Sequence, residues 1–272
     1  MKNTNAAAGK LAIVGAGNIG CAIARGAAAA GLYRREDITL ARRRQELLGP
    51  LKAEGYRVTH DNLEALKGAD LVILAVGPQQ LEGVVRELSP ALKPGQALVS
   101  IVTGVTLAQI GGWLKKKAPV VRAMSNTAIA IREAMTCLCA APEHAAELAR
   151  AKRLFDSVGS TLVIDEELML SATALAGCGI AFFLRAIRAA SQGGTQIGFH
   201  SEEAMLLAAQ TARGAASLLL KGGHPESEID KVTTPRGCTI EGLNEMEHHG
   251  FSSALITGIV TSNEKASTLF RK

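Results

Sequence analysis

Three glycines at fixed spacing are the first residues in this chain whose pattern could do chemistry. The apolar run Leu11–Val14 leads directly into a G-x-G-x-x-G segment, and an alanine-rich helical stretch follows it. In this strand–turn–helix setting the pattern is typical of a turn that binds the pyrophosphate of a dinucleotide. A tight turn without a ligand is the competing interpretation, and the position directly after the first strand disfavours it. We therefore predict that the dinucleotide contacts Gly15, Ala16, Gly17, Asn18, Ile19 and Gly20.

Three arginines, Arg42, Arg43 and Arg44, follow the predicted second strand at Ile38–Leu40. An NAD site usually has a carboxylate at this place to bind the ribose hydroxyls, and here there is none. Guanidinium groups bind a 2′-phosphate through forked hydrogen bonds, so we predict NADP(H), bound by Arg42 and Arg43, with NAD(H) as the alternative. A solvated basic helix start is the other interpretation of the same run, because runs of charge usually lie at the surface.

The elements that must position these residues predict an α/β chain with two domains. Short β-branched runs alternate with helical stretches up to residue 165, which indicates a mostly parallel sheet covered by helices. After that point a run from about Glu166 to Gln192 is apolar almost all round and needs burial on every side. We expect a Rossmann-like dinucleotide-binding domain over residues 1–165 and an all-helical dimerisation and substrate domain over residues 166–272. The predicted strands are Leu11–Val14, Ile38–Leu40, Leu71–Val76, Ala97–Val102, Val120–Met124, Thr136–Leu138 and Thr161–Ile164.

Composition argues against several other classes of protein. The net charge of +5 in 272 residues and the aromatic content of 3% supply neither a basic tract nor a stacking platform, so we expect no nucleic-acid partner. The five cysteines lack C-x-x-C spacing and nearby histidines, which predicts reduced thiols in a cytoplasmic protein and no metal site. The polar start of the chain predicts no secretory signal. The apolar stretch Leu168–Leu184 meets Arg185 directly, so we expect a buried helix there and no membrane segment.

Four segments resemble motifs of the pyrroline-5-carboxylate reductase family. The segment 75–79, AVGPQ, is similar to the family's A-V-K-P-Q element, and the segment 121–128, VRAMSNTA, is similar to V-R-x-M-P-N-T-P. The segment 176–182, AGCGIAF, resembles the G-S-G-P-A-Y helix. The longest match is 230–243, DKVTTPRGCTIEGL, which resembles D-x-V-T-T-P-G-G-T-T-x-x-G-L. These segments lie in the family's order, and the resemblance extends over nearly the whole chain.

The resemblance implies NADPH-dependent reduction of 1-pyrroline-5-carboxylate, an imino acid, to proline. It also implies a homodimer formed through the helical domain, with a larger homo-oligomer as the alternative. Further cofactor contacts would come from Asn62, Ala75, Val76, Gly77, Pro78, Met124 and Asn126. The substrate carboxylate would lie on the backbone amides of Arg236, Gly237, Cys238 and Thr239. Departures from the family pattern at Gly77, Cys178, Arg236 and Cys238 bear on substrate range more than on the class of reaction.

The polar residues of the helical part favour an imine as the substrate. Reduction of a ketone needs a proton donor beside the carbonyl oxygen, and related hydroxyacid dehydrogenases place lysine and asparagine on the long helix for this purpose. Here no lysine lies between Arg153 and Leu220, and no asparagine between Thr127 and Leu243. A cyclic imine can bind already protonated, and by the family match the Thr239 hydroxyl would orient its ring nitrogen as the catalytic group.

Three alternatives stay open at this point. Thr239 could simply cap its helix, a role that threonine often fills. The altered loop could admit a cyclic imino acid with a ring of different size. The chain could also be a dinucleotide-binding regulator that has lost its chemistry, because two family prolines and the family lysine are replaced.

Overall fold

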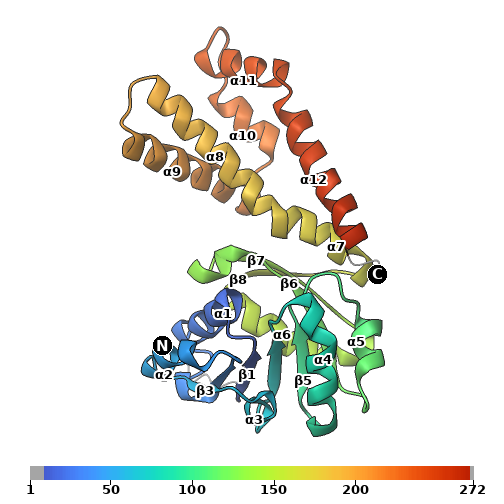
Figure 1. Ribbon diagram of the computed structural model, residues 1–272. Coiled ribbons are helices and arrows are strands. Elements are labelled where there is room, and N and C mark those ends of the chain that lie inside the picture. The colour runs from blue at the N-terminus through green and yellow to red at the C-terminus, as the bar shows by residue number, and fades with distance from the viewer. Residues whose placement is uncertain (1–8, 270–272) are drawn as a thin grey trace. The chain divides into compact units, whose positions relative to one another are not determined.

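The computed structural model describes residues 9–269, which form two compact units (Figure 1). One unit comprises the chain up to Gly177 and again from Asn263, and the other is Cys178–Ser262. The first unit contains the whole sheet, and the second is helical. The predicted fold class is confirmed, whereas the exact boundary at residue 165 stays a prediction.

The sheet of the first unit has eight strands in the order β3-β2-β1-β4-β5-β6-β7-β8. Neighbouring strands are parallel except for β6 and β7, so β7 and β8 run opposite to the rest. Strand β3 was not predicted from the sequence, because its three residues are exposed or half-buried and carry no apolar pattern. The strands are β1 (Leu11–Val14), β2 (Ile38–Ala41), β3 (Arg57–Thr59), β4 (Leu71–Leu74), β5 (Ala97–Ser100), β6 (Val120–Met124), β7 (Ala134–Ala140) and β8 (Gly159–Val163).

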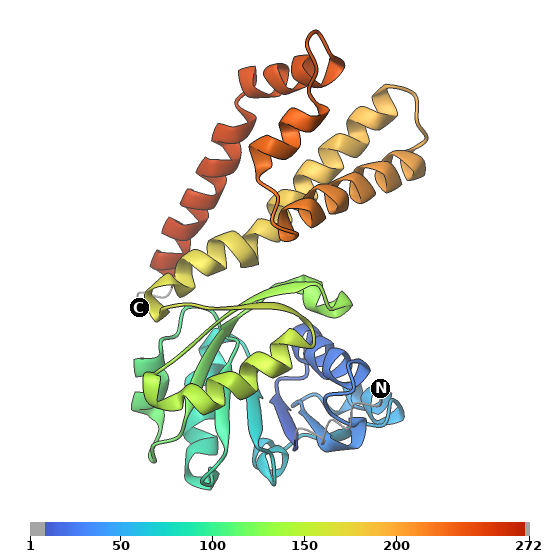
Figure 2. The same ribbon diagram turned by 180° about the vertical axis from the view of Figure 1, so that it is seen from behind.

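Helices cover both faces of this sheet, which explains why its central strands are apolar at every position. Alternate side chains of β1 enter two separate cores: Leu11 and Ile13 pack in one, and Ala12 and Val14 in the other. The first core includes residues of α1 (Asn18–Ala29), α2 (Gly49–Ala53) and α6 (Ala145–Asp156), and Figure 2 shows α1 and α6 in front of the sheet. The second core includes residues of α3 (Asn62–Leu66), α4 (Pro78–Leu88) and α5 (Leu107–Trp113), of which α4 and α5 lie in front in Figure 1.

The long apolar run after β8 is helical but not uniform. A 3₁₀ turn at Glu166–Leu168 leads into α7 (Met169–Ala172), then a π-helical segment at Thr173–Cys178, and then α8 (Gly179–Gln196). The predicted helix is therefore present, although a wide turn interrupts it. Such π-helical segments are rare and often occur at functional sites.

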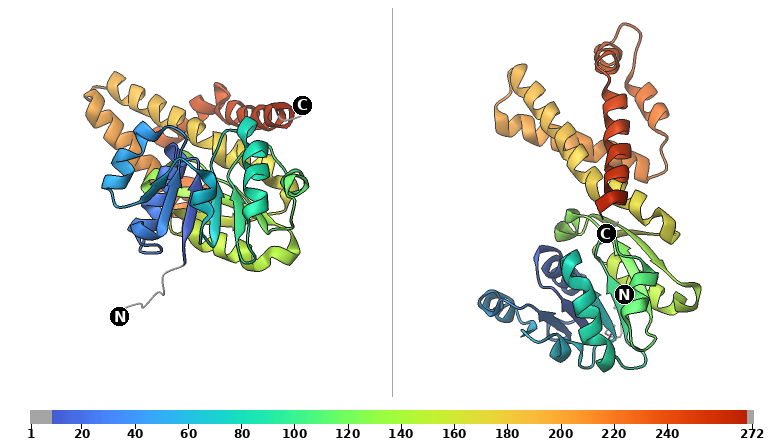
Figure 3. Two further views of the ribbon diagram at one scale, coloured as in Figure 1. Left: turned by 60° about the horizontal axis from the view of Figure 1, so that its bottom comes forward. Right: turned by 45° about the vertical axis from the view of Figure 1, so that its right-hand side comes forward.

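The second unit contains almost no core of its own. Its α8 and α9 (Ser201–Leu220) lie side by side, close enough that a Cβ on Gly194 would stand 3.0 Å from the Cβ of Ala204 (Figure 3). Further along the chain come α10 (Pro225–Val232), α11 (Cys238–His248) and α12 (Phe251–Leu269). Among the described residues of this unit, Gly179, Ser191 and Ala204 are the buried ones. Helices with so little buried surface need cover from outside the unit itself.

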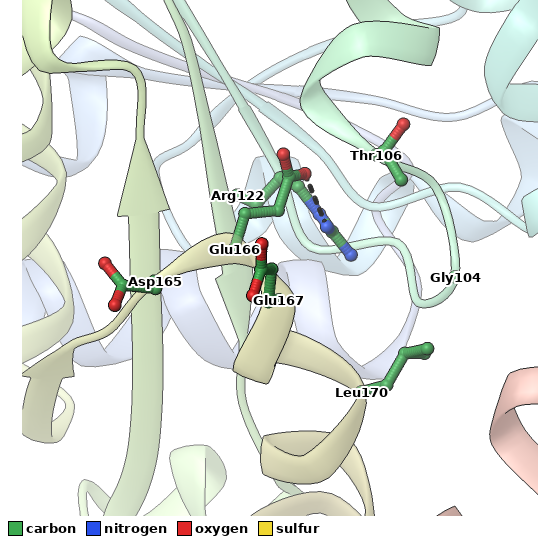
Figure 4. A pocket seen from close by; sticks show the side chains of 7 residues that line it. All are labelled: Gly104, Thr106, Arg122, Asp165, Glu166, Glu167 and Leu170. Carbon is green, nitrogen blue, oxygen red and sulfur yellow. Dashed lines mark hydrogen bonds and ion pairs between the residues drawn. The ribbon is translucent and has the colours of Figure 1, made fainter. Parts of the chain in front are cut away.

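An ion pair joins the sheet to the start of the helical run. Arg122 of β6 is 7% exposed, and its Nη1 donates to Glu166 Oε1 at 2.6 Å (Figure 4). The same oxygen accepts the N–H of Leu107, the first residue of α5, at 2.7 Å. A buried guanidinium needs this partner, because an unpaired charge in the interior is costly.

We predict that Glu166→Gln lowers the free energy of unfolding by roughly 2 kcal/mol, less than for a fully buried pair because the Glu166 side chain is 32% exposed. The reason is that the buried Arg122 guanidinium loses its counter-charge. Urea denaturation of the variant and of a matched control, Glu167→Gln, measures this effect. The control should stay within about 0.5 kcal/mol of the native chain. Equal destabilisation by both substitutions would contradict the role given to the pair.

Candidate functional site

The glycine turn lies where the strand order of the sheet reverses. Strand β1 has β2 on one side and β4 on the other, so the chain leaves β1 at a topological switch point, where open α/β sheets bind their ligands. Gly15 and Ala16 both donate their N–H groups to Ala41 O at 3.0 Å, and Gly17 N donates to Gly15 O at 2.8 Å. The turn is thus held by backbone bonds to the end of β2.

A different steric reason favours glycine at each of the three positions of the turn. Gly15 has a φ of +103°, and a Cβ there would stand 2.4 Å from Ala75 O. A Cβ on Gly20 would stand 2.4 Å from Gly15 O, so that position allows α1 to pack against the turn. A Cβ on Gly17 would meet nothing within 4 Å, so the backbone there faces open space. This arrangement fits a phosphate group above Gly17, where the first N–H groups of α1 have no intrahelical partner.

A cavity of about 300 Å³ opens above this turn. Nine of the residues predicted to bind the cofactor line it: Gly15, Ala16, Gly17, Arg42, Arg43, Asn62, Ala75, Val76 and Gly77. Pro78 is the first residue of α4, directly after Gly77. Five further lining residues were not predicted from the sequence: Val14, Ala41, Arg44, Gln80 and Val84. Gln80 and Val84 could have been predicted as lining residues, because both lie on the helix that begins at the predicted contact Pro78.

The cavity favours an anion. Its described lining contains three arginines and no carboxylate. Arg43 and Arg44 are exposed, whereas Arg42 is partly buried and donates from Nη1 to Ala16 O at 2.8 Å. The Asn62 amide donates to Glu87 Oε2 at 3.0 Å. The thiol of Cys21 also lies 3.5 Å from Ala16 O, and burial raises its pKa, which keeps the thiol protonated as a donor.

Met124 and Asn126 lie at the carboxyl end of β6, outside the lining of this cavity. The Met124 sulfur accepts a hydrogen bond from Thr103 Oγ1 at 3.7 Å, and a Cβ on Gly177 would clash with Met124 Cε. Asn126 donates from Nδ2 to Ala176 O, within the π-helical segment, at 3.1 Å. The structure thus gives both residues a role in holding that segment, and their contact with a cofactor stays a prediction.

The predicted substrate loop belongs to the second unit and forms a tight turn before α11. Gly237 N donates to Thr234 O at 2.9 Å, and Arg236 has a φ of +59°. This left-handed conformation suits glycine, which the family pattern has at this position. Gly237 is the N-cap of α11 and has no side chain for the role, whereas Thr239 is the second residue of the helix. The capping alternative for Thr239 is therefore wrong.

A second cavity, of about 620 Å³, surrounds the ion pair described above (Figure 4). None of the predicted site residues lines it. Its charged groups are Arg122, whose Nη1 binds Glu166, and the carboxylates of Asp165, Glu166 and Glu167. With more negative than positive groups, this lining does not suit the phosphates of a dinucleotide. The cavity at the glycine turn is therefore the better candidate for the cofactor site.

The fold and this site define a Rossmann-type dinucleotide-binding protein with a helical C-terminal part. Residues 10–104 match the family model described as NADP oxidoreductase, coenzyme F420-dependent, and residues 166–269 match that of pyrroline-5-carboxylate reductase dimerisation. Pyrroline-5-carboxylate reductase 2 of Dictyostelium discoideum is 44% identical over 94% of this chain and 92% of its own length. The chain belongs to the pyrroline-5-carboxylate reductase family.

Two further relatives show how far the likeness extends. Pyrroline-5-carboxylate reductase 1 of Dictyostelium discoideum is 47% identical over 96% of this chain, which spans 50% of that relative's length. The solved structure of a pyrroline-5-carboxylate reductase from Coxiella burnetii is 28% identical, has a TM-score of 0.90, and covers 97% of this chain and 100% of its own. The likeness thus extends over both the sheet unit and the helical unit.

We predict that Gly17→Ala impairs the binding of NADPH, whereas Gly20→Ala impairs the stability of the fold. The Gly17→Ala side chain enters open space, so stability stays within about 0.5 kcal/mol while the affinity for NADPH falls about tenfold or more. The Gly20→Ala side chain meets the Gly15 carbonyl and lowers the free energy of unfolding by about 1–3 kcal/mol. Thermal unfolding and NADPH titration of both variants measure the two effects. Normal NADPH binding by Gly17→Ala would show that no phosphate lies over that residue.

Proposed function

We propose that this chain reduces 1-pyrroline-5-carboxylate to proline with NADPH. One observation carries this proposal: the chain is 44% identical to a pyrroline-5-carboxylate reductase over nearly the full length of both proteins. The glycine turn at the switch point and the arginines beside it support the nucleotide, with NADH as the weaker donor. These features assign both a cofactor and a reaction to the same chain.

The residues of the first unit hold the dinucleotide by its phosphates. The amide groups at the start of α1 take the pyrophosphate, and guanidinium groups after β2 take the 2′-phosphate. Bound NADPH supplies a hydride for the carbon of the substrate's C=N bond. The protein supplies placement, which is a large part of the rate enhancement when two reactants must meet in one geometry.

The start of α11 holds the substrate carboxylate in this proposal. The N-cap is Gly237, so no side chain competes for the first N–H groups of the helix. The positive end of the helix dipole favours an anion at this place. Thr239, in the first turn, then orients the ring nitrogen through its hydroxyl. A protonated imine needs little further proton transfer, in keeping with the lack of lysine and asparagine on α8.

We predict that the native chain oxidises NADPH on addition of 1-pyrroline-5-carboxylate and that Thr239→Ala lowers kcat about 10- to 100-fold. The loss follows from removal of one hydrogen bond to a charged group. Thr239→Ser keeps the hydroxyl and should retain most of the turnover, and the Kd for NADPH should be nearly the same in all three proteins. Absorbance at the NADPH band measures the rate. Binding of NADPH without turnover by the native chain would favour the non-catalytic regulator.

A cyclic imino acid of different ring size is the second candidate substrate, and one observation favours it. Arg236 places a long cationic side chain in a left-handed turn where the family pattern has glycine. Such a residue costs about 1 kcal/mol or more, and strained residues cluster at functional sites. A higher kcat/KM for a six-membered than for a five-membered imino acid would select this alternative.

The helical unit supports self-association as a homodimer. Large apolar side chains on its helices are exposed, with Ile197 78% and Leu220 87% exposed. Among the described residues, one helical run, Glu166–Gln196, is long and apolar enough to cross a membrane, and it lies within the dimerisation match. We infer that a partner subunit covers this run. The five cysteines are free, which fits a protein of the reducing cytoplasm.

We predict that the native chain, of 28.4 kDa, has a molar mass of at least two subunits in solution. Ile256 and Val260 are 62% and 50% exposed and lie one turn apart on α12. Replacing both with glutamate should shift the protein toward the monomer, because charge at an apolar interface is costly. Leu47→Glu, on an exposed leucine of the first unit, is the matched control. Light scattering after gel filtration measures all three, and a monomeric native chain would rule out the proposed dimer.

A further inference from the structure

We propose that Arg42 is a positioning residue that holds the phosphate-binding turn, and that Arg43 and Arg44 bind the 2′-phosphate. This inference rests on the proposed function and divides the roles within the arginine run. It concerns which atoms of the dinucleotide each guanidinium affects. Binding of the pyrophosphate, which NADPH and NADH share, depends on Arg42. Binding of the 2′-phosphate, which NADPH alone has, depends on Arg43 and Arg44.

The contacts of Arg42 point into the turn. Its Nη1 donates to Ala16 O at 2.8 Å, and its own N–H donates to Thr59 O at 3.1 Å. The residue therefore links the end of β2 to both the turn and β3. Ala16 is fully buried, so its carbonyl depends on protein donors for hydrogen bonds. The Cys21 thiol, at 3.5 Å, is the weaker of the two side-chain donors to that oxygen.

The peptide group between Ala16 and Gly17 is the part of the turn that Arg42 restrains. Its carbonyl accepts from Arg42, and its N–H, on Gly17, donates to Gly15 O at 2.8 Å. Rotation of this peptide would turn a carbonyl oxygen toward the open space at Gly17, which the proposed function assigns to the pyrophosphate. An oxygen facing a phosphate repels it. Arg42 keeps that oxygen turned into the protein and adds a positive charge beneath the anion.

Arg43 and Arg44 have no such engagement in the part of the chain that the structure describes. Both are exposed and line the cavity above the turn. Neither forms an ion pair or a side-chain hydrogen bond among the described residues. Their guanidinium groups keep all their donors for a phosphate, which guanidinium binds in a forked geometry.

Titration of this chain with NADPH and with NADH tests this division of roles. Arg42→Ala should raise the Kd for both dinucleotides by about tenfold, with the NADPH:NADH selectivity unchanged within a factor of three. Arg43→Ala and Arg44→Ala should each reduce the selectivity about tenfold or more. Arg42→Lys keeps the charge without the planar fork, and we expect it to weaken both dinucleotides as well. Arg57→Ala, an exposed arginine on β3, is the matched control for loss of charge.

Two outcomes would overturn the inference. One is an Arg42→Ala variant that loses affinity for NADPH and binds NADH normally, because Arg42 would then be a ligand of the 2′-phosphate. The other is an Arg42→Ala variant that binds both dinucleotides normally while its thermal unfolding matches that of the native chain. The proposed reaction fails separately, since a chain that binds NADPH but does not turn over imino acid still allows the Kd values to be compared.

Discussion

The close approach of backbone segments at the carboxyl end of β1 is the constraint on which the site depends. Gly15 packs against the Ala75 carbonyl, Gly20 packs against Gly15, and the Ala41 carbonyl accepts two N–H groups of the turn. Peptide groups therefore present the binding surface, and side chains would separate them. Because backbone amides carry no net charge, they bind a phosphate chiefly by being held in place beforehand.

Charge around the turn adds selectivity to this backbone recognition. The cavity's described lining has guanidinium groups on the β2 side and uncharged residues on the β4 side. In the proposed site, the dipole of α1 and the arginines would attract the same ligand from two directions. In the proposed site the two effects are separable, since the helix start would face the phosphates that all dinucleotides share, and the exposed arginines would face the group that distinguishes NADPH from NADH.

The two units obtain their stability in different ways. The sheet unit buries two cores, one on each face, as a self-sufficient domain does. The helical unit buries little and exposes many large apolar side chains, so it lacks a comparable core. The contacts of Glu166 with Arg122 and of Asn126 with Ala176 fix the first part of the helical run to β6. These bonds lie within the sheet unit and do not depend on a partner.

The sheet, the helical second part, the glycine turn and the arginine run could all be predicted from the sequence, because period, β-branching and glycine spacing are local properties that one segment carries. It did not reveal β3, whose half-exposed residues are strand only because β2 pairs with them. Three features became visible in the folded chain alone: the Arg42 guanidinium donates to Ala16 O, the Asn126 amide donates to the π-helical segment, and Gly237, not Thr239, occupies the N-cap position of α11. These facts depend on which groups from distant segments meet, and no local pattern records the position of a partner 26 or 50 residues away.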